Sequence, residues 1–95
     1  MGAAELVVDL RDRRIETLAD FWDSIAGPLG LPDWFGRNLD AWWDTIENGG
    51  ISATVDDADP LIVRVSPSGL FAPGNSDGTR LIRVFQDSTR ATLIS

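Results

Sequence analysis

The sequence predicts a single α/β domain over residues 1–95, in which a small three-stranded parallel sheet has helices packed on it. Short β-branched runs alternate along the chain with segments whose apolar residues recur at helical spacing. A helix between two strands lets the second strand return parallel to the first. The length suits one hydrophobic core, and no repeat or linker divides the chain.

The expected strands are short, apolar and rich in β-branched residues, and they cover residues 5–10, 61–65 and 91–95. The expected helices have apolar positions on one face, and they cover residues 18–29, 39–48 and 79–88. The intervening segments are rich in Gly, Pro, Ser, Asn or Asp, and we expect loops over residues 30–36, 50–59 and 66–78.

Capping residues predict where the helices begin and end. Thr17, with Asp20 three positions later, matches a capping box at the start of the first helix. Asn38 is a good N-cap for the second helix, which Gly49 and Gly50 end. The second helix therefore has a signal at each end.

Several residue types that enzymes use are missing. The sequence contains no Cys, His, Lys or Tyr, which excludes disulfides, thiolate nucleophiles and the commonest general base. Catalysis would depend on carboxylates, hydroxyls and Arg, which are poor proton-transfer groups at neutral pH. We therefore expect a protein that is not an enzyme and that binds no cofactor or metal ion.

The net charge of −7 is unevenly distributed along the chain. Residues 1–37 sum to −3 and residues 64–95 to +2, whereas residues 38–63 contain six acids and no base. Such a concentration of negative charge repels nucleic acid and attracts a basic partner. A solvated acidic surface without any partner explains the same charges equally well.

The second expected helix separates its acids from its apolar residues. At about 100° per residue, one stripe is apolar and consists of Leu39, Trp42 and Ile46, with Trp43 at its border. A second stripe is wholly acidic and consists of Asp40, Asp44 and Glu47. Asp40 and Asp44 repel one another one turn apart, and local conflicts of this kind tend to lie at functional sites.

Residues 31–46 have a pattern that is specific to one family. The segment reads Leu-Pro-Asp-Trp-Phe-Gly-Arg-Asn-Leu-Asp-Ala-Trp-Trp-Asp-Thr-Ile, and it strongly resembles the signature segment of the barstar family of ribonuclease inhibitors. Eleven positions match without a gap: Pro32, Trp34, Phe35, Gly36, Asn38, Leu39, Asp40, Ala41, Trp43, Asp44 and Ile46. Weaker similarity extends upstream and downstream of this segment.

The resemblance implies a function and a set of contact residues. Members of this family insert the second helix and the preceding loop into the cleft of a small microbial, guanyl-specific ribonuclease, where their carboxylates take the places of RNA phosphates. By position, Asp44 is the main phosphate mimic, Asp40 is its neighbour, and Trp34 packs on catalytic side chains. The other contact residues that the resemblance implies are Phe35, Gly36, Asn38, Trp43 and Asp87.

The sequence departs from the family pattern after the second helix. Several extra residues precede the second strand, and the acids among them are Asp56, Asp57 and Asp59. We expect residues 47–59 to form a mobile acidic loop that speeds encounter with a basic partner. The loop at residues 66–78 stands where the family has a short third helix. The resemblance also implies a cis peptide bond before Pro60.

Other functions remain open on the sequence alone. Asp40 and Asp44 could act as an acid–base pair in an enzyme, but exposed neighbouring carboxylates lack the burial that separates pKa values. The three acids at residues 56–59 lack the spacing and the Gly of a calcium-binding loop. An antitoxin-like or nucleic-acid-mimicking module with a different basic partner fits the same distribution of charge.

The location of the protein is also predicted from charge. Residues 1–14 carry charges where a secretory signal requires an apolar run, and no run of about 18 apolar residues is present. We therefore expect a cytoplasmic bacterial protein that binds neither membrane nor nucleic acid. In the absence of its ribonuclease partner, we expect it to be a monomer.

Overall fold

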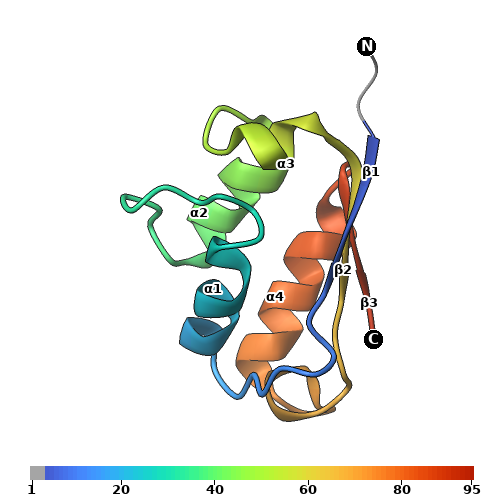
Figure 1. Cartoon of the computed structure of the whole chain (residues 1–95). Helices are drawn as coiled ribbons and strands as arrows, with labels where there is room; N and C mark the ends of the chain where they lie inside the picture. Colours follow the sequence, from blue (N-terminus) through green and yellow to red (C-terminus); the bar gives the residue numbers. More distant parts are fainter. Residues whose placement is uncertain (1–3) are drawn as a thin grey trace.

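A parallel sheet and a layer of helices make up the structure, a computed structural model that describes residues 4–95. Residues 1–3, with which the predicted domain begins, lie outside this range. The helices of the described part lie on one side of the sheet (Figure 1). The predicted α/β fold with a three-stranded parallel sheet is confirmed.

The sheet has the strand order β1-β2-β3, so strands that follow one another in sequence are neighbours. The strands are β1 (Ala4–Asp9), β2 (Ala58–Arg64) and β3 (Ala91–Ile94). Leu61 of the central strand is aligned with Leu6 on one side and with Ala91 on the other. The three predicted strands are confirmed, and β2 begins earlier than predicted because Ala58 pairs with Ala4.

Helical segments of three kinds connect the strands. The α-helices are α1 (Leu18–Ala26), α2 (Leu39–Trp43), α3 (Ala53–Asp57) and α4 (Ser76–Asp87). A π-helical turn, η1 (Asp44–Asn48), continues α2, and a 3-10 turn, η2 (Gly69–Phe71), precedes α4. The capping box of α1 is confirmed, because the Thr17 hydroxyl accepts from the Asp20 amide and the Asp20 carboxylate accepts from the Thr17 amide. This helix ends at Ala26, three residues earlier than predicted.

Helix α4 begins within the segment that we expected to be a loop. The Asn75 side chain caps it by accepting a hydrogen bond from the Gly78 amide at 3.0 Å. Gly78 is buried against η2, where a Cβ would overlap the backbone oxygen of Leu70. Only glycine fits this close contact, so a residue that usually marks a loop lies inside a helix. The expectation of a loop through residue 78 was therefore wrong.

The core between the two layers is centred on Phe21 of α1, which is fully buried. Its ring packs edge-to-face against the rings of Trp22, Trp42, Phe71 and Phe85, with centroid distances from 5.3 to 6.4 Å. Such pairs add about 0.5–1.5 kcal/mol each beyond the area that they bury. The cluster therefore fixes α1, α2, η2 and α4 relative to one another.

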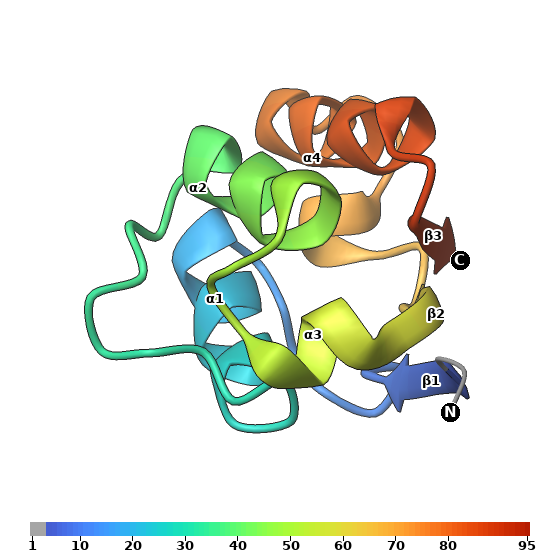
Figure 2. The same ribbon diagram turned by 90° about the horizontal axis from the view of Figure 1, so that it is seen from above.

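The predicted loop over residues 50–59 contains α3, which lies between η1 and β2 (Figure 2). Ser52, only 3% exposed, donates a hydrogen bond to the backbone oxygen of Leu29 at 2.5 Å and accepts one from the Val55 amide at 3.2 Å. The Val55 side chain is buried. The expectation of an irregular acidic loop was therefore wrong. The bond between Asp59 and Pro60 is cis, as the resemblance implied.

We expect Ser52→Ala to lower the free energy of unfolding by about 1–3 kcal/mol, because it leaves a buried carbonyl without its partner and removes the cap of α3. Chemical denaturation measures this loss. Ser68→Ala is the matched control, since Ser68 is also an N-cap residue but is exposed and makes no side-chain capping bond. Equal losses in the two variants would contradict this role of Ser52.

Candidate functional site

The continuous helix formed by α2 and η1 buries one side and exposes the other. Trp42, Thr45 and Ile46 are at most 1% exposed, and the Thr45 hydroxyl donates to the backbone oxygen of Ala41 at 2.8 Å. Leu39 and Trp43 are half-buried. The predicted apolar stripe, with Trp43 at its border, is confirmed.

Asp40 and Asp44 lie on the exposed side of this helix. Within residues 4–95, neither forms an ion pair. Asp44 accepts one hydrogen bond, from the side-chain amide of Asn48 at 2.7 Å. Two carboxylates one turn apart therefore face solvent without a neutralising cation. This arrangement costs about 0.2–0.5 kcal/mol in helix stability and leaves both groups able to bind a cationic partner.

Glu47, the third member of the predicted acidic stripe, is instead bonded within the protein. It is half-buried, and its carboxylate accepts hydrogen bonds from the Ser88 hydroxyl (2.8 Å), the Thr89 amide (3.0 Å) and the Thr89 hydroxyl (2.6 Å). The Thr89 hydroxyl is the main cause that lowers the pKa of Glu47, followed by the Ser88 hydroxyl, and the charge of Arg90 acts in the same direction. Glu47 therefore differs from Asp40 and Asp44, the two solvent-facing members of the predicted stripe.

The π-helical turn explains part of this difference between Glu47 and the two solvent-facing acids. The Gly49 amide donates to the backbone oxygen of Asp44 at 2.9 Å, five residues back, instead of four as in an α-helix. This wider turn rotates the chain less per residue and brings Glu47 nearer to the buried side than a regular α-helical wheel predicts. The remaining cause is a contact with residues about forty positions away in the sequence, which periodicity does not indicate.

The loop before α2 presents one aromatic side chain to solvent and buries the next. Trp34 is 69% exposed, whereas Phe35 is 7% exposed and packs edge-to-face on Trp22 with a centroid distance of 5.6 Å. The resemblance implied that both rings face a partner. In the structure Phe35 belongs to the core, where it holds the loop that presents Trp34.

Gly36 and Asn38 form a tight turn between this loop and α2. The Asn38 side chain caps α2 by accepting from the Ala41 amide at 2.7 Å, and it also donates to the backbone oxygen of Gly36 at 3.0 Å. A Cβ on Gly36 would lie 3.1 Å from the Cβ of Ala41, which is tighter than ordinary contact. Both residue types therefore support the turn, and half of the side-chain hydrogen-bonding capacity of Asn38 is already used.

Arg37, a base within this acidic segment, is turned away from α2. Its backbone has a positive φ of 51°, and its side chain lies against α1. There the guanidinium lies 3.0 Å from the Asp23 carboxylate and donates to the backbone oxygen of Ala19 at 3.3 Å. The positive charge of Arg37 is thus balanced on α1. Sequence reasoning did not find this contact, because the left-handed backbone of a non-glycine residue has no reliable sequence signal.

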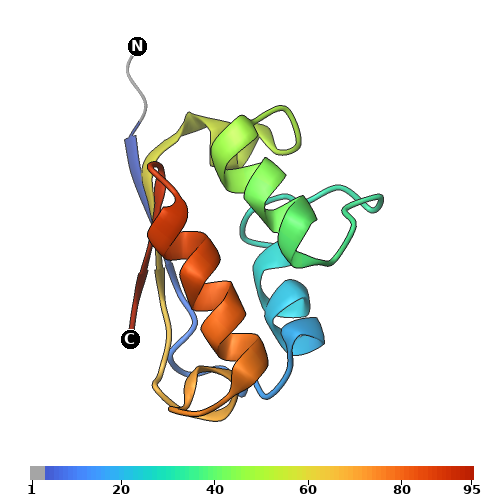
Figure 3. The same ribbon diagram turned by 180° about the vertical axis from the view of Figure 1, so that it is seen from behind.

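Asp87 is the exposed last residue of α4. Figure 3 shows α4 and α2 side by side, with the loop that carries Trp34 on the far side of α2. The Glu47 hydrogen bonds join η1 to the residues that follow Asp87. The loop, α2–η1 and the end of α4 therefore carry the predicted contact residues on adjoining elements.

The acids of the added segment, Asp56, Asp57 and Asp59, do not act as one group. The Asp56 carboxylate accepts from the Gly50 amide at 3.0 Å, and its other oxygen is buried without a partner. Asp57 and Asp59 are exposed. Across residues 4–95, no group of three or more potential ligands is placed to hold a metal ion. Nor does any helix in this range have the length and apolar character to cross a membrane.

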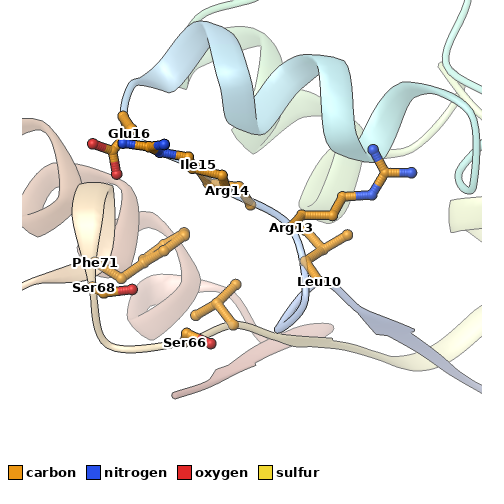
Figure 4. Close-up of a pocket in the computed structure, with 9 residues that line it drawn as sticks. Leu10, Arg13, Arg14, Ile15, Glu16, Ser66, Ser68 and Phe71 are labelled. Atoms are coloured by element: carbon orange, nitrogen blue, oxygen red, sulfur yellow. The ribbon is translucent and has the colours of Figure 1, made fainter.

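A small cavity lies between the β1–α1 loop and the segment after β2 (Figure 4). Its volume is about 50 Å³, well below the size of typical small-molecule sites. Figure 4 shows the side chains of Arg13 and Glu16 at opposite ends of the cavity. The Leu70 amide donates to the backbone oxygen of Ile15 across this boundary at 2.9 Å. The cavity is therefore a packing feature between two loops.

The contacts of Glu47 make stability depend on pH. Because the pKa of Glu47 in the folded state lies below its ordinary value of 4.5, the carboxylate stabilises the fold fully above that pH, and this contribution is lost as the pH falls through the lowered pKa. We expect Glu47→Gln to destabilise the protein at about pH 7 and to have less effect near about pH 3. Denaturation at both pH values measures this difference. Equal effects at the two pH values would contradict it.

Comparison with known families identifies the relatives of this chain. Residues 5–92 match the family model of Barstar (barnase inhibitor), which covers nearly the whole chain. No curated protein matches the sequence. The family match agrees with the parallel α/β fold and with the segment from the Trp34 loop to η1. The protein therefore belongs to the barstar family of ribonuclease inhibitors.

Proposed function

We propose that this protein inhibits a small guanyl-specific microbial ribonuclease by blocking its active site with α2–η1 and the preceding loop. The observation that carries the proposal is the pair of exposed carboxylates, Asp40 and Asp44, without a neutralising cation in the described part of the chain. The family match supplies the class of partner. The proposed role of the protein is binding, and not catalysis.

Asp44 and Asp40 are proposed to occupy the positions of RNA phosphates. A ribonuclease cleft presents cationic side chains, to which carboxylates make short, charge-assisted hydrogen bonds. Excess negative charge on the inhibitor also steers the encounter with a positive cleft. Asp44 is expected to be the stronger mimic, and its bond to Asn48 keeps its side chain in place before binding.

Trp34 is the proposed aromatic anchor of the interface. It is the most exposed large hydrophobic side chain of the described residues, and buried aromatic anchors carry much of the binding energy of interfaces. Gly36, Asn38 and Trp43 are proposed to line the contact surface, and Asp87 is proposed as an acid at its edge. Phe35 is proposed to contribute indirectly, because its buried ring holds in place the loop that presents Trp34.

The direct test is a titration of a guanyl-specific ribonuclease with this protein, with residual RNA cleavage as the signal. We expect activity to fall to zero at one inhibitor per enzyme. The competing proposal is an acidic antitoxin-like or nucleic-acid-mimicking module with another basic partner. Full ribonuclease activity at a large excess of the protein would favour that alternative. A bacterial, cytoplasmic location and a monomeric free state are part of our proposal.

We expect Asp44→Ala to weaken inhibition by orders of magnitude without loss of stability. Truncating one member of a desolvated charge pair costs about 2–5 kcal/mol or more, a range known from the barnase–barstar complex of this family. Folding does not depend on Asp44, and its removal relieves repulsion with Asp40. Asp40→Ala should show a smaller loss of inhibition.

The measurement pairs thermal unfolding with ribonuclease inhibition for each variant. Asp57→Ala, measured at high salt, is the matched control, because it removes an exposed acid of α3 outside the proposed contact surface and its long-range attraction is screened under these conditions. Unchanged inhibition by Asp44→Ala would contradict the phosphate-mimic mechanism even in a fully folded variant.

The exposed acids of the added segment are expected to act on the association rate only. Replacing Asp57 and Asp59 together with Asn should slow association at low salt and have little effect at high salt, because screening removes long-range attraction. Stopped-flow kinetics at two salt concentrations measures this. A raised dissociation rate at high salt would instead place these residues in the interface. Asp56 is left unchanged, because it bonds to the backbone of Gly50.

A further inference from the structure

The turn between α4 and β3 is held from two sides. On one side, both carboxylate oxygens of Glu47 accept hydrogen bonds from Ser88 and Thr89. On the other side, the Arg90 guanidinium donates to the backbone oxygen of Asp56, at the end of α3, at 2.8 Å. This short turn, which directly follows Asp87, is thus bonded both to the helix that carries Asp44 and to the added helix α3.

We infer that Glu47 is a positioning residue, which holds Asp87 on the same binding surface as Asp44 by anchoring the α4–β3 turn to η1. This inference rests on the proposed function. It gives Glu47, which the helical periodicity placed in one acidic stripe with Asp40 and Asp44, a structural role within the same surface.

The hydrogen bonds of Glu47 make it a poor direct ligand for a partner's cations. Its carboxylate is half-buried and accepts three internal hydrogen bonds, whereas Asp44 is exposed and accepts one. Three of its roughly four acceptor sites are thus occupied, against one in Asp44. Rearranging this network would break three hydrogen bonds to a charged carboxylate, which are stronger than hydrogen bonds between neutral groups.

The Ser88 hydroxyl connects Glu47 to the first residue of β3 through hydrogen bonds. While it donates to Glu47, its oxygen accepts from the amides of Arg90 and Ala91, each at 3.1 Å. Its orientation toward Glu47 leaves its lone pairs for these two amides, so the three bonds reinforce one another. Glu47 therefore fixes the point at which the chain leaves α4 and enters β3.

The test compares Glu47→Ala, Glu47→Gln and Asp87→Ala, alone and combined, in ribonuclease inhibition at a temperature where every variant is folded. We expect Asp87→Ala to raise the inhibition constant about two- to fivefold, as for an exposed ion pair. Glu47→Ala should raise it by a similar factor, and the combined variant should show no further loss. Glu47→Gln should stay close to the wild type, because its carbonyl oxygen still accepts from Ser88 and Thr89.

Each other outcome contradicts the inference. Additive losses in the combined variant would mean that Glu47 and Asp87 act independently. An equal loss in Glu47→Gln and Glu47→Ala would make the Glu47 charge itself a contact. Inhibition that is unchanged in Glu47→Ala would limit its role to folding.

A measurement on the free protein separates this inference from the proposed function. Amide hydrogen exchange at Thr89 should be faster in Glu47→Ala than in the wild type and intermediate in Glu47→Gln. If the wild type inhibits no ribonuclease, the proposed function fails, and the exchange rates alone decide whether Glu47 holds the turn. Unchanged exchange at Thr89 in Glu47→Ala would overturn the positioning role.

Discussion

The burial of Trp42 determines how the acidic surface is presented. Its indole is fully buried against Phe21, Trp22 and Phe85 at centroid distances from 5.7 to 6.0 Å. Rotating α2 would expose this large ring, at a cost of about 1.5–3 kcal/mol or more. With that face fixed, Asp40 and Asp44 must point to solvent. The hydrophobic core therefore sets the direction of the carboxylates.

Much of the fold could be predicted from the sequence, because strands β1–β3 and helices α1 and α2 depend on local periodicity and capping. Thr17 and Asn38 are local signals of this kind, and both cap as predicted. The missed elements depend on distant contacts. Helix α3 is too short to be stable alone and is held by the bond from Ser52 to Leu29. The start of α4 contains Gly78. Glycine is needed there because the backbone of Leu70, in another segment, lies too close for a Cβ atom.

The residues of the site divide in the same way, into those that local patterns predict and those that distant contacts determine. The positions of Asp40, Asp44 and Trp34 could be predicted, because they depend on a helical stripe and on a family segment without gaps. The contacts of Phe35 and Glu47 could not be predicted, since Phe35 packs on Trp22 of α1 and Glu47 bonds to the turn between α4 and β3. The distribution of charge in a sequence thus indicates an acidic region. Only the three-dimensional contacts distinguish acids that face solvent from acids that already accept hydrogen bonds within the protein.

The central claim is that the carboxylates of α2 take the place of RNA phosphates in a ribonuclease cleft. The most direct measurement is the dependence of inhibition of a guanyl-specific ribonuclease on the concentration of RNA. Since inhibitor and substrate would occupy the same cleft, we expect the apparent inhibition constant to rise linearly with RNA concentration. Inhibition that does not change with RNA concentration would contradict the account, because the protein would then bind outside the active site.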